Sequence, residues 1–193
     1  MTDHLHKPGR CGSTLWITGL PAAGKTSVAH ALERRLAEFG RIAVLLDGDV
    51  LRAGLSSDLG TSRADRSEQA RRTAHLAALI SGAGPVAIVA LVSPYAADRR
   101  RARELHDEAG LDFHEVFLDT PLPVCEQRDP KGLYARARAG RLDGMTGVDA
   151  PYEPPLSPAV RIRGGETSPD EAAYEILAAT EIILAEEVGA ARS

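Results

Sequence analysis

Short apolar runs alternate along this chain with longer segments that have helical patterning. The short runs end at Gly, Pro, Asp or Ser and predict buried strands. The longer segments predict helices, the last of them amphipathic with Ser168 as its expected N-cap. The expected strands are 14–18, 42–46, 86–92, 113–118 and 160–162, and the expected helices are 27–38, 65–81, 97–109, 122–128 and 169–188.

Alternating strands and helices are typical of a doubly wound α/β fold, here a three-layer α/β/α arrangement with a mainly parallel central sheet. In such sheets the ligand crevice lies at the carboxyl ends of the strands. Residues 129–158 form a long polar segment rich in Gly, Pro and Arg, which predicts a functional or mobile lid. We therefore expect one domain over residues 13–193 after a flexible tail, residues 1–12.

Composition narrows the classes of function. The 193 residues carry a formal net charge of −4, which argues against a broad nucleic-acid-binding surface. Cys11 and Cys125 lack the spacing of a disulfide framework or a zinc site, which fits a reducing cytosol. The first residues are polar and no run reaches the about 18 apolar residues of a membrane span, so we expect a cytoplasmic protein without membrane or nucleic-acid partners.

The pattern G-x-x-x-x-G-K-[ST] follows the first expected strand directly. Gly19 and Gly24 allow backbone N–H groups to approach and point at phosphate oxygens. Lys25 adds positive charge at the terminal phosphates, and the Thr26 hydroxyl can coordinate Mg²⁺. A chance glycine-rich turn is the alternative, but the strand before the pattern and the helix after it favour a phosphate-binding loop (P-loop). We therefore expect ATP and Mg²⁺ as ligands, with ATP contacts from Gly19, Leu20, Pro21, Ala22, Ala23, Gly24, Lys25, Thr26, Ser27 and, near the start of the lid, Arg128.

Acidic and hydroxyl side chains follow two other expected strands. Asp47 and Asp49 are one residue apart, so in an extended segment they can face the same side. One of them can then hold Mg²⁺ through water while the other orients or deprotonates an acceptor hydroxyl; an ordinary Asp-Gly-Asp turn is the alternative. Ser93 ends the third strand, where its hydroxyl can contact substrate or carry phosphate transiently, or simply terminate the strand before Pro94.

Basic side chains near these acids suggest an anionic or polar acceptor. Arg52 follows the acidic pair, and Arg66 and Gln69 lie three residues apart on one expected helical face. The lid adds further cations, including Lys131, and its closure can exclude water from the transition state. We expect Arg71, Arg72 and most of the charge in 97–109 to lie on solvated surface.

Several segments, in order along nearly the whole chain, resemble adenylylsulfate kinase. They are Gly-Leu-Pro-Ala-Ala-Gly-Lys-Thr at 19–26, Leu-Asp-Gly-Asp at 46–49, Asp-Leu-Gly at 58–60, Ser-Arg-Ala-Asp-Arg at 62–66, Ser-Pro-Tyr at 93–95, Arg-Asp-Pro-Lys-Gly-Leu-Tyr at 128–134, Ala-Arg-Ala-Gly at 137–140, Thr-Gly-Val-Asp at 146–149 and Pro-Tyr-Glu at 151–153.

The resemblance implies transfer of the ATP γ-phosphoryl group to the 3′-hydroxyl of adenosine 5′-phosphosulfate, by a protein that forms a homodimer. It implies Thr26 and Asp47 as metal ligands and Asp49 as the carboxylate at the acceptor hydroxyl. The implied catalytic residues are Lys25, Asp47, Asp49 and Ser93, and the implied acceptor contacts are Asp49, Arg52, Thr61, Arg66, Gln69, Ser93, Lys131, Met145 and Thr146. Ser93 matches a serine that the family is often described as phosphorylating, although direct transfer needs no phosphoserine.

The sequence departs from the family pattern in the acceptor half. Thr61 and Met145 stand where the family usually has Phe, and those aromatics are expected to sandwich the acceptor adenine. Gln69 replaces Asn, Val50 replaces Asn, and Ala53 replaces His. Two alternatives therefore stay open: a related kinase for a different hydroxyl compound, such as a sugar or aminocyclitol, and a nucleotide-dependent switch without chemistry. The retained arginines at 52 and 66 favour an anionic acceptor.

Overall fold

A five-stranded sheet forms the middle layer of the computed structural model, which describes residues 12–182. The strands are β1 (Ser13–Thr18), β2 (Ala43–Asp47), β3 (Val86–Ala90), β4 (Asp112–Leu118) and β5 (Val160–Ile162), in the spatial order β2-β3-β1-β4-β5. Every neighbouring pair is parallel, so the carboxyl ends of all five strands meet at one edge. The expected parallel α/β sheet is confirmed.

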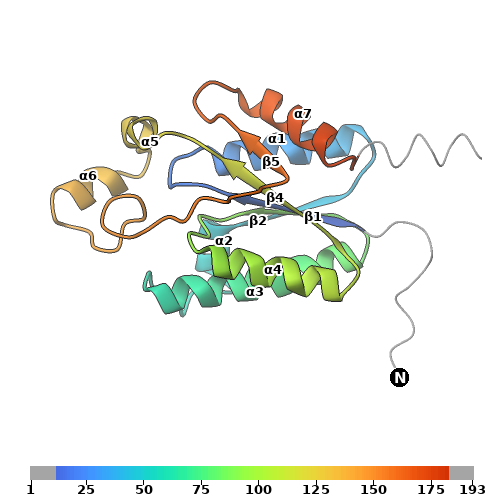
Figure 1. Cartoon of the computed structure of the whole chain (residues 1–193), viewed down its shortest axis with the longest axis horizontal. Coiled ribbons are helices and arrows are strands. Elements are labelled where there is room, and N and C mark those ends of the chain that lie inside the picture. Colours follow the sequence, from blue (N-terminus) through green and yellow to red (C-terminus); the bar gives the residue numbers. More distant parts are fainter. Residues whose placement is uncertain (1–11, 183–193) are drawn as a thin grey trace, which may run out of the picture.

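Helices cover both faces of this sheet (Figure 1). α1 (Lys25–Glu38) and α7 (Pro169–Ala179) lie on one face, and α3 (Arg63–Gly82) and α4 (Ala96–Glu108) on the other. Because side chains alternate along a strand, Leu15 and Ile17 of β1 pack into the core under α1 and α7, whereas Trp16 packs into the core under α3 and α4. Three short helices complete the chain at the carboxyl edge: α2 (Gly48–Ala53), α5 (Leu122–Arg128) and α6 (Leu133–Arg138).

Local sequence explains where the long helices begin. Ser168 is the N-cap of α7, as expected, and its hydroxyl accepts from the Glu171 N–H while the Glu171 carboxylate accepts from the Ser168 N–H. Ser62 and Asp65 form the same capping box at the start of α3. Helix α7 ends at Ala179, earlier than expected, and the rest of the predicted helix, 183–188, lies outside the described residues.

The structure differs from the sequence-based expectations in three further places. Helix α2 replaces the extended segment expected after β2, and helix α6 lies within the long polar segment 129–158, where no helix was expected. Gly12, expected in the tail, is buried: its N–H donates to the Ser81 carbonyl at 2.9 Å, and a Cβ there would lie 1.9 Å from the Pro85 carbonyl oxygen. On α4, most of the charged side chains are exposed as expected, and Asp98 and Arg99 are the buried exceptions. The remaining tail, 1–11, lies outside the described residues.

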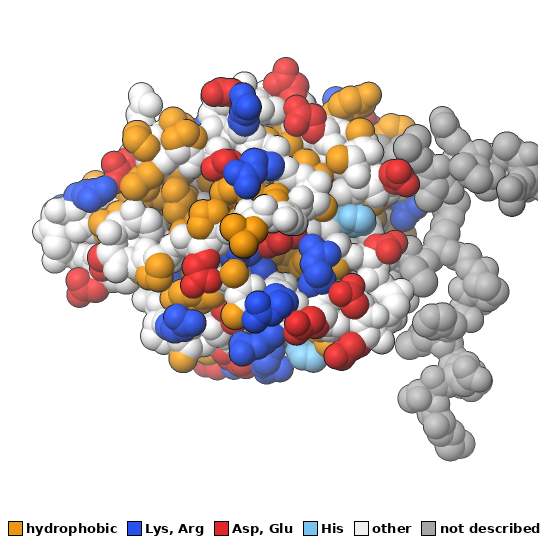
Figure 2. Space-filling model, viewed as in Figure 1, with side chains coloured by type: hydrophobic (Ala, Val, Ile, Leu, Met, Phe, Trp, Pro, Cys, Tyr) orange, Lys and Arg blue, Asp and Glu red, His pale blue; other side chains and the backbone are white. Residues whose placement is uncertain are grey.

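The distribution of surface charge and the character of the helices bear on whether nucleic acid or a membrane could be a partner. On the face shown in Figure 2, Lys and Arg side chains are interspersed with Asp and Glu rather than spread as one basic surface. Within residues 12–182, no helix is both long enough and apolar enough to cross a bilayer.

Candidate active site

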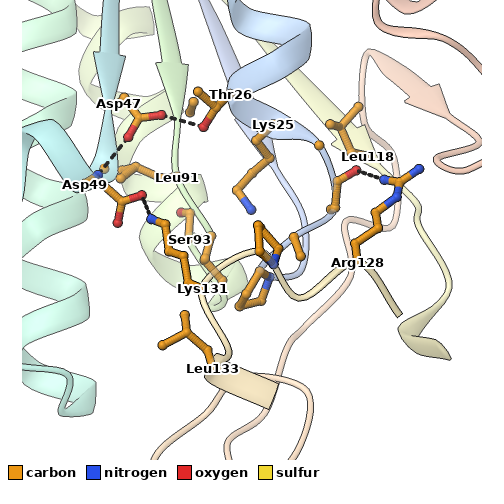
Figure 3. Close-up of a pocket in the computed structure, with 18 of the residues that line it drawn as sticks. Lys25, Thr26, Asp47, Asp49, Leu91, Ser93, Leu118, Arg128, Lys131 and Leu133 are labelled. Atoms are coloured by element: carbon orange, nitrogen blue, oxygen red, sulfur yellow. Dashed lines mark hydrogen bonds and ion pairs between the residues drawn. The ribbon is translucent and has the colours of Figure 1, made fainter. Parts of the chain in front are cut away.

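A cavity of about 710 Å³ opens at the carboxyl edge of the sheet, between the P-loop and the lid. Figure 3 shows side chains from distant parts of the sequence converging on it. Most predicted site residues line this cavity: Pro21, Ala22, Ala23, Gly24, Lys25, Thr26, Ser27, Asp47, Asp49, Arg52, Thr61, Arg66, Gln69, Ser93, Arg128, Lys131 and Met145. The sheet topology brings them together because β1, β2 and β3 all end here.

The P-loop has the backbone geometry that its sequence demands. Gly24 has φ +106°, which L side chains rarely adopt, and it is the N-cap of α1. A Cβ on Gly19 would lie 2.8 Å from the Leu118 carbonyl oxygen, so this position needs glycine for close approach. The loop therefore turns sharply from β1 into α1, and the N-terminus of α1 faces the cavity.

Lys25 is the principal cation of the loop. Its Nζ donates to the Gly19 carbonyl at 3.0 Å and to the Leu20 carbonyl at 2.7 Å, so these two predicted ATP contacts hold the lysine rather than line the cavity. Burial lowers the pKa of Lys25 to about 8, and the nearby carboxylates of Asp47 and Asp49 oppose that effect only in part. The side chain points into the cavity in Figure 3.

The two acids have different environments, which corrects the expectation that they share an extended segment. The Asp47 carboxylate accepts from the Asp49 N–H at 2.8 Å and so starts helix α2, because a capped N-terminus replaces the extended backbone. Asp47 is buried and accepts from the Thr26 hydroxyl at 2.7 Å, whereas Asp49 is exposed and its carboxylate is bonded to the Lys131 ammonium. Thr26 and Asp47 thus offer adjoining hard oxygen donors of the kind that Mg²⁺ prefers.

The side chains predicted to hold the acceptor also bond to the backbone around the cavity. The Arg52 guanidinium donates to the Gly60 carbonyl at 2.7 Å, and the Gln69 amide donates to the Gly48 carbonyl at 3.2 Å. Arg66 bridges the start of α3 and the lid, donating to the Thr61 carbonyl at 3.0 Å and the Gly144 carbonyl at 2.8 Å. Arg66 therefore bonds to the backbone at or beside Thr61 and Met145, the two positions where the family usually has Phe.

Thr146 is one predicted acceptor contact that the structure does not bring to the cavity. Its side chain is fully buried, and its hydroxyl has no hydrogen-bond partner among the described residues. The adjoining Met145 lines the cavity instead, with its N–H donating to the Asp149 carboxylate at 2.7 Å. Of these two neighbours, Met145 lines the cavity and Thr146 does not.

The sequence analysis missed a group of cavity residues that follows β5. A Gly-Gly pair one residue after a strand was the available signal, because the carboxyl end of that strand lies at the same edge. A Cβ on Gly164 would lie 1.6 Å from the Thr120 hydroxyl oxygen, so glycine is required there. The missed residues are Ile162, Gly164, Gly165, Thr167, Pro169 and Ala172, and they line the cavity along with Arg128.

A P-loop with its lysine, a hydroxyl–carboxylate pair at the end of β2 and a lid together define a P-loop kinase, an enzyme that moves the terminal phosphoryl group of ATP to a hydroxyl. The family model described as adenylylsulphate kinase matches residues 11–163. The chain belongs to the adenylylsulphate kinase family.

Individual relatives of the chain support the same family. The chain is 51% identical over 166 residues to the bifunctional enzyme CysN/CysC of Mycobacterium tuberculosis; the match covers 86% of this chain and 27% of that longer relative. It is 47% identical over 175 residues to the adenylyl-sulfate kinase of Saccharomyces cerevisiae, covering 89% of this chain and 87% of the yeast enzyme. The solved structure of the M. tuberculosis APS kinase CysC in complex with AMPPNP and APS superposes with a TM-score of 0.87 at 50% identity, covering 90% of this chain and 99% of that one.

Proposed function

We propose that this protein transfers the γ-phosphoryl group of ATP to the 3′-hydroxyl of adenosine 5′-phosphosulfate. The observation that carries the proposal is that one cavity is lined by both sets of side chains that the reaction needs. We assign Lys25, Thr26 and Asp47 to the donor, and we assign Asp49, Arg52 and Arg66 to the acceptor. A relative of 50% identity was solved with an ATP analogue and APS, which supports both ligands.

Each side chain has a definite task in this reaction. Thr26 and Asp47 would hold Mg²⁺, which when bound neutralises charge on the phosphates. Asp49 orients the acceptor hydroxyl and accepts its proton as the new O–P bond forms and the bond between the γ-phosphorus and the β,γ-bridging oxygen breaks. Lys25 stabilises the charge that develops on the departing ADP and the transferred group. No phosphoserine is needed at Ser93, because the acceptor oxygen attacks the γ-phosphorus directly.

The acceptor side lacks the aromatic sandwich expected from the resemblance. Tyr134 is the sole aromatic among the cavity-lining residues, and its hydroxyl donates to the Pro21 carbonyl of the P-loop at 3.0 Å. Thr61 is exposed and Met145 is buried at the cavity wall. A Met sulfur can still cover an adenine, but this wall also favours a second candidate acceptor, a hydroxyl compound without a base.

A panel assay tests the proposal. Release of ADP from Mg-ATP is measured with adenosine 5′-phosphosulfate and with sugar and aminocyclitol alcohols, and the phosphorylated product is identified by mass. We expect kcat/KM to be highest for adenosine 5′-phosphosulfate and transfer to be abolished by Lys25→Met. A higher kcat/KM for an alcohol without a base rejects the proposed acceptor, and ATP binding without turnover on any acceptor rejects the kinase in favour of a switch.

The expected homodimer stays a prediction. Light scattering on the purified chain measures its mass directly, and a mass of about 20 kDa, close to the 20.5 kDa of one chain, contradicts the prediction.

A further inference from the structure

Arg99 of α4 is an arginine buried behind the active-site wall. It is 3% exposed, whereas the side chains of its neighbours Arg100 and Arg101 are 67% and 74% exposed. A fully charged guanidinium is seldom buried unless every direction of its fork is satisfied. The burial of Arg99 therefore calls for a reason that the exposed arginines of the same helix do not share.

The guanidinium joins three segments that are far apart in sequence. Nε donates to the Glu115 carboxylate of β4 at 2.6 Å, Nη1 donates to the Ser93 carbonyl at 2.7 Å, and Nη2 donates to the Glu153 carbonyl at 2.6 Å. Glu115 balances the charge, so the two terminal nitrogens are left to hold two pieces of backbone. One of these pieces is the cavity wall at Ser93, and the other belongs to the end of the lid.

The end of the lid, residues 151–155, is fastened to this wall by further bonds; we call these residues the return leg. The Glu153 N–H donates to the Pro94 carbonyl at 2.8 Å, and its carboxylate accepts from the Ala96 N–H at 2.8 Å. Tyr152 stacks on Phe117 of β4, and its hydroxyl is 3.0 Å from the Thr18 hydroxyl. The return leg is thus the fixed end of a lid whose Lys131 reaches Asp49.

Ser93 shows why this fastening matters at the site. It has φ +42°, uncommon for a residue other than glycine, and it lines the cavity. Its buried hydroxyl has no hydrogen-bond partner within the described part of the chain. Such a backbone conformation persists only where the surroundings hold it, and Arg99 holds its carbonyl.

We propose that Arg99 is a positioning residue for phosphoryl transfer: its guanidinium holds the Ser93 carbonyl and the Glu153 carbonyl, and thereby fixes the acceptor wall and the anchored end of the lid relative to each other. The inference rests on the proposed function. It assigns no contact with substrate to Arg99, which does not line the cavity.

The test replaces the buried pair as a unit. The double variant Arg99→Met with Glu115→Gln removes both charges, so no buried carboxylate is left without its partner. Arg99→Lys keeps a positive charge beside Glu115 but lacks the planar fork that reaches both carbonyls. Arg100→Met and Arg101→Met are the matched controls on the exposed face of the same helix.

Two readouts separate positioning from mere stability. We expect the double variant and Arg99→Lys to lower kcat/KM for the acceptor at least tenfold, with the Kd for ATP within twofold of the wild-type value, because the P-loop keeps its own contacts. We also expect ATP hydrolysis per phosphoryl group transferred to rise severalfold, since a loosened lid admits water. The Kd for ATP and the hydrolysis ratio do not depend on the folded fraction, and kcat/KM is taken per active site so that it does not depend on that fraction either.

The outcomes are distinct. If the acceptor kcat/KM per active site and the hydrolysis ratio stay at wild-type values, or if the controls change as much, Arg99 does not position the site. Arg99→Lys decides the matter if the double variant does not fold. If the wild-type protein phosphorylates an alcohol other than adenosine 5′-phosphosulfate, the proposed function fails, and the same comparison with that alcohol still tests Arg99.

Discussion

Replacing Lys25 with Met should stabilise the protein while it abolishes phosphoryl transfer. The pKa of Lys25 falls from an ordinary 10.5 to about 8 because burial disfavours the ammonium. That difference corresponds to about 3 kcal/mol of destabilisation at pH 7, where the ammonium prevails in both the folded and the unfolded chain. The side chain lines a cavity that is open to solvent, and its Nζ bonds to the Gly19 and Leu20 carbonyls are lost in the variant. We therefore expect a net gain of ~1 to 2 kcal/mol in the free energy of unfolding.

The sign of the pH dependence makes this prediction specific. Below pH 8 both states carry the charged lysine, and the folded state bears the full cost of burying it. Between pH 8 and 10.5 the folded protein loses this proton before the unfolded chain does, so the wild-type protein recovers stability there. The advantage of Lys25→Met should therefore shrink from pH 7 to pH 10.

Urea denaturation at both pH values measures the effect, and Lys131→Met is the control because its exposed ion pair with Asp49 contributes about 0–1 kcal/mol. Transfer by Lys25→Met should fall about a hundred- to thousandfold or more. An equally stable or less stable Lys25→Met variant at pH 7, or a gain that does not change with pH, would refute the reasoning that burial of this ammonium costs stability.

Three further predictions concern other parts of the molecule. Thr61→Phe combined with Met145→Phe should lower the KM for adenosine 5′-phosphosulfate about tenfold, because one restored stacking contact is worth about 1 to 3 kcal/mol. The KM for ATP should stay unchanged in the same steady-state kinetics, and an unchanged KM for adenosine 5′-phosphosulfate contradicts the prediction. Gly164→Ala should lower the free energy of unfolding by about 1 to 3 kcal/mol and weaken ATP binding, since its Cβ would overlap the Thr120 side chain. Gly54→Ala is the control, because its Cβ meets nothing within 4 Å. Urea midpoints measure the stability of both variants, and calorimetry measures their binding of ATP. Burial lowers the pKa of His106, so below about pH 6.5 the unfolded chain takes up a proton that the folded protein resists, and the free energy of unfolding should fall toward pH 5.5. His106→Gln should reduce that fall, and an undiminished fall excludes His106 as its source.

Periodic patterns in the sequence predict the sheet and the long helices closely, because each of those elements is specified by its own residues. β5 and α5 have the expected bounds, and Ser168 is the N-cap of α7 as predicted. The short helices α2 and α6 escaped prediction because they bury few side chains and depend on a local cap or on tertiary contacts. Asp47 illustrates this: its carboxylate looks like a site residue in the sequence, and it is also the N-cap that turns the following residues into a helix.

The active-site residues also fall into those that a local sequence pattern predicts and those that only the fold brings to the cavity. The P-loop is a contiguous pattern, and its residues could be named from eight letters of sequence. The residues after β5 carry only a Gly-Gly pair as a local signal, and they reach the cavity because the parallel sheet brings the carboxyl end of β5 to the same edge as the P-loop. Arg99 is the extreme case, since it stands in a run of arginines whose other members are exposed.

Some basic side chains of this protein are buried while others of the same residue type are exposed, and the buried ones point to function. Four basic side chains follow one another closely on α4, but the partners that neutralise and orient Arg99 come from β4, from the turn after β3 and from the end of the lid. Lys25 is likewise a cation whose burial removes it from water, which lowers its pKa. A chain selected for stability alone would replace both with apolar side chains of similar volume. Lys25 lines the cavity, and Arg99 lies behind its wall at Ser93. The proposed transfer reaction accounts for both, because Lys25 would supply charge to the phosphates and Arg99 would keep that wall in place.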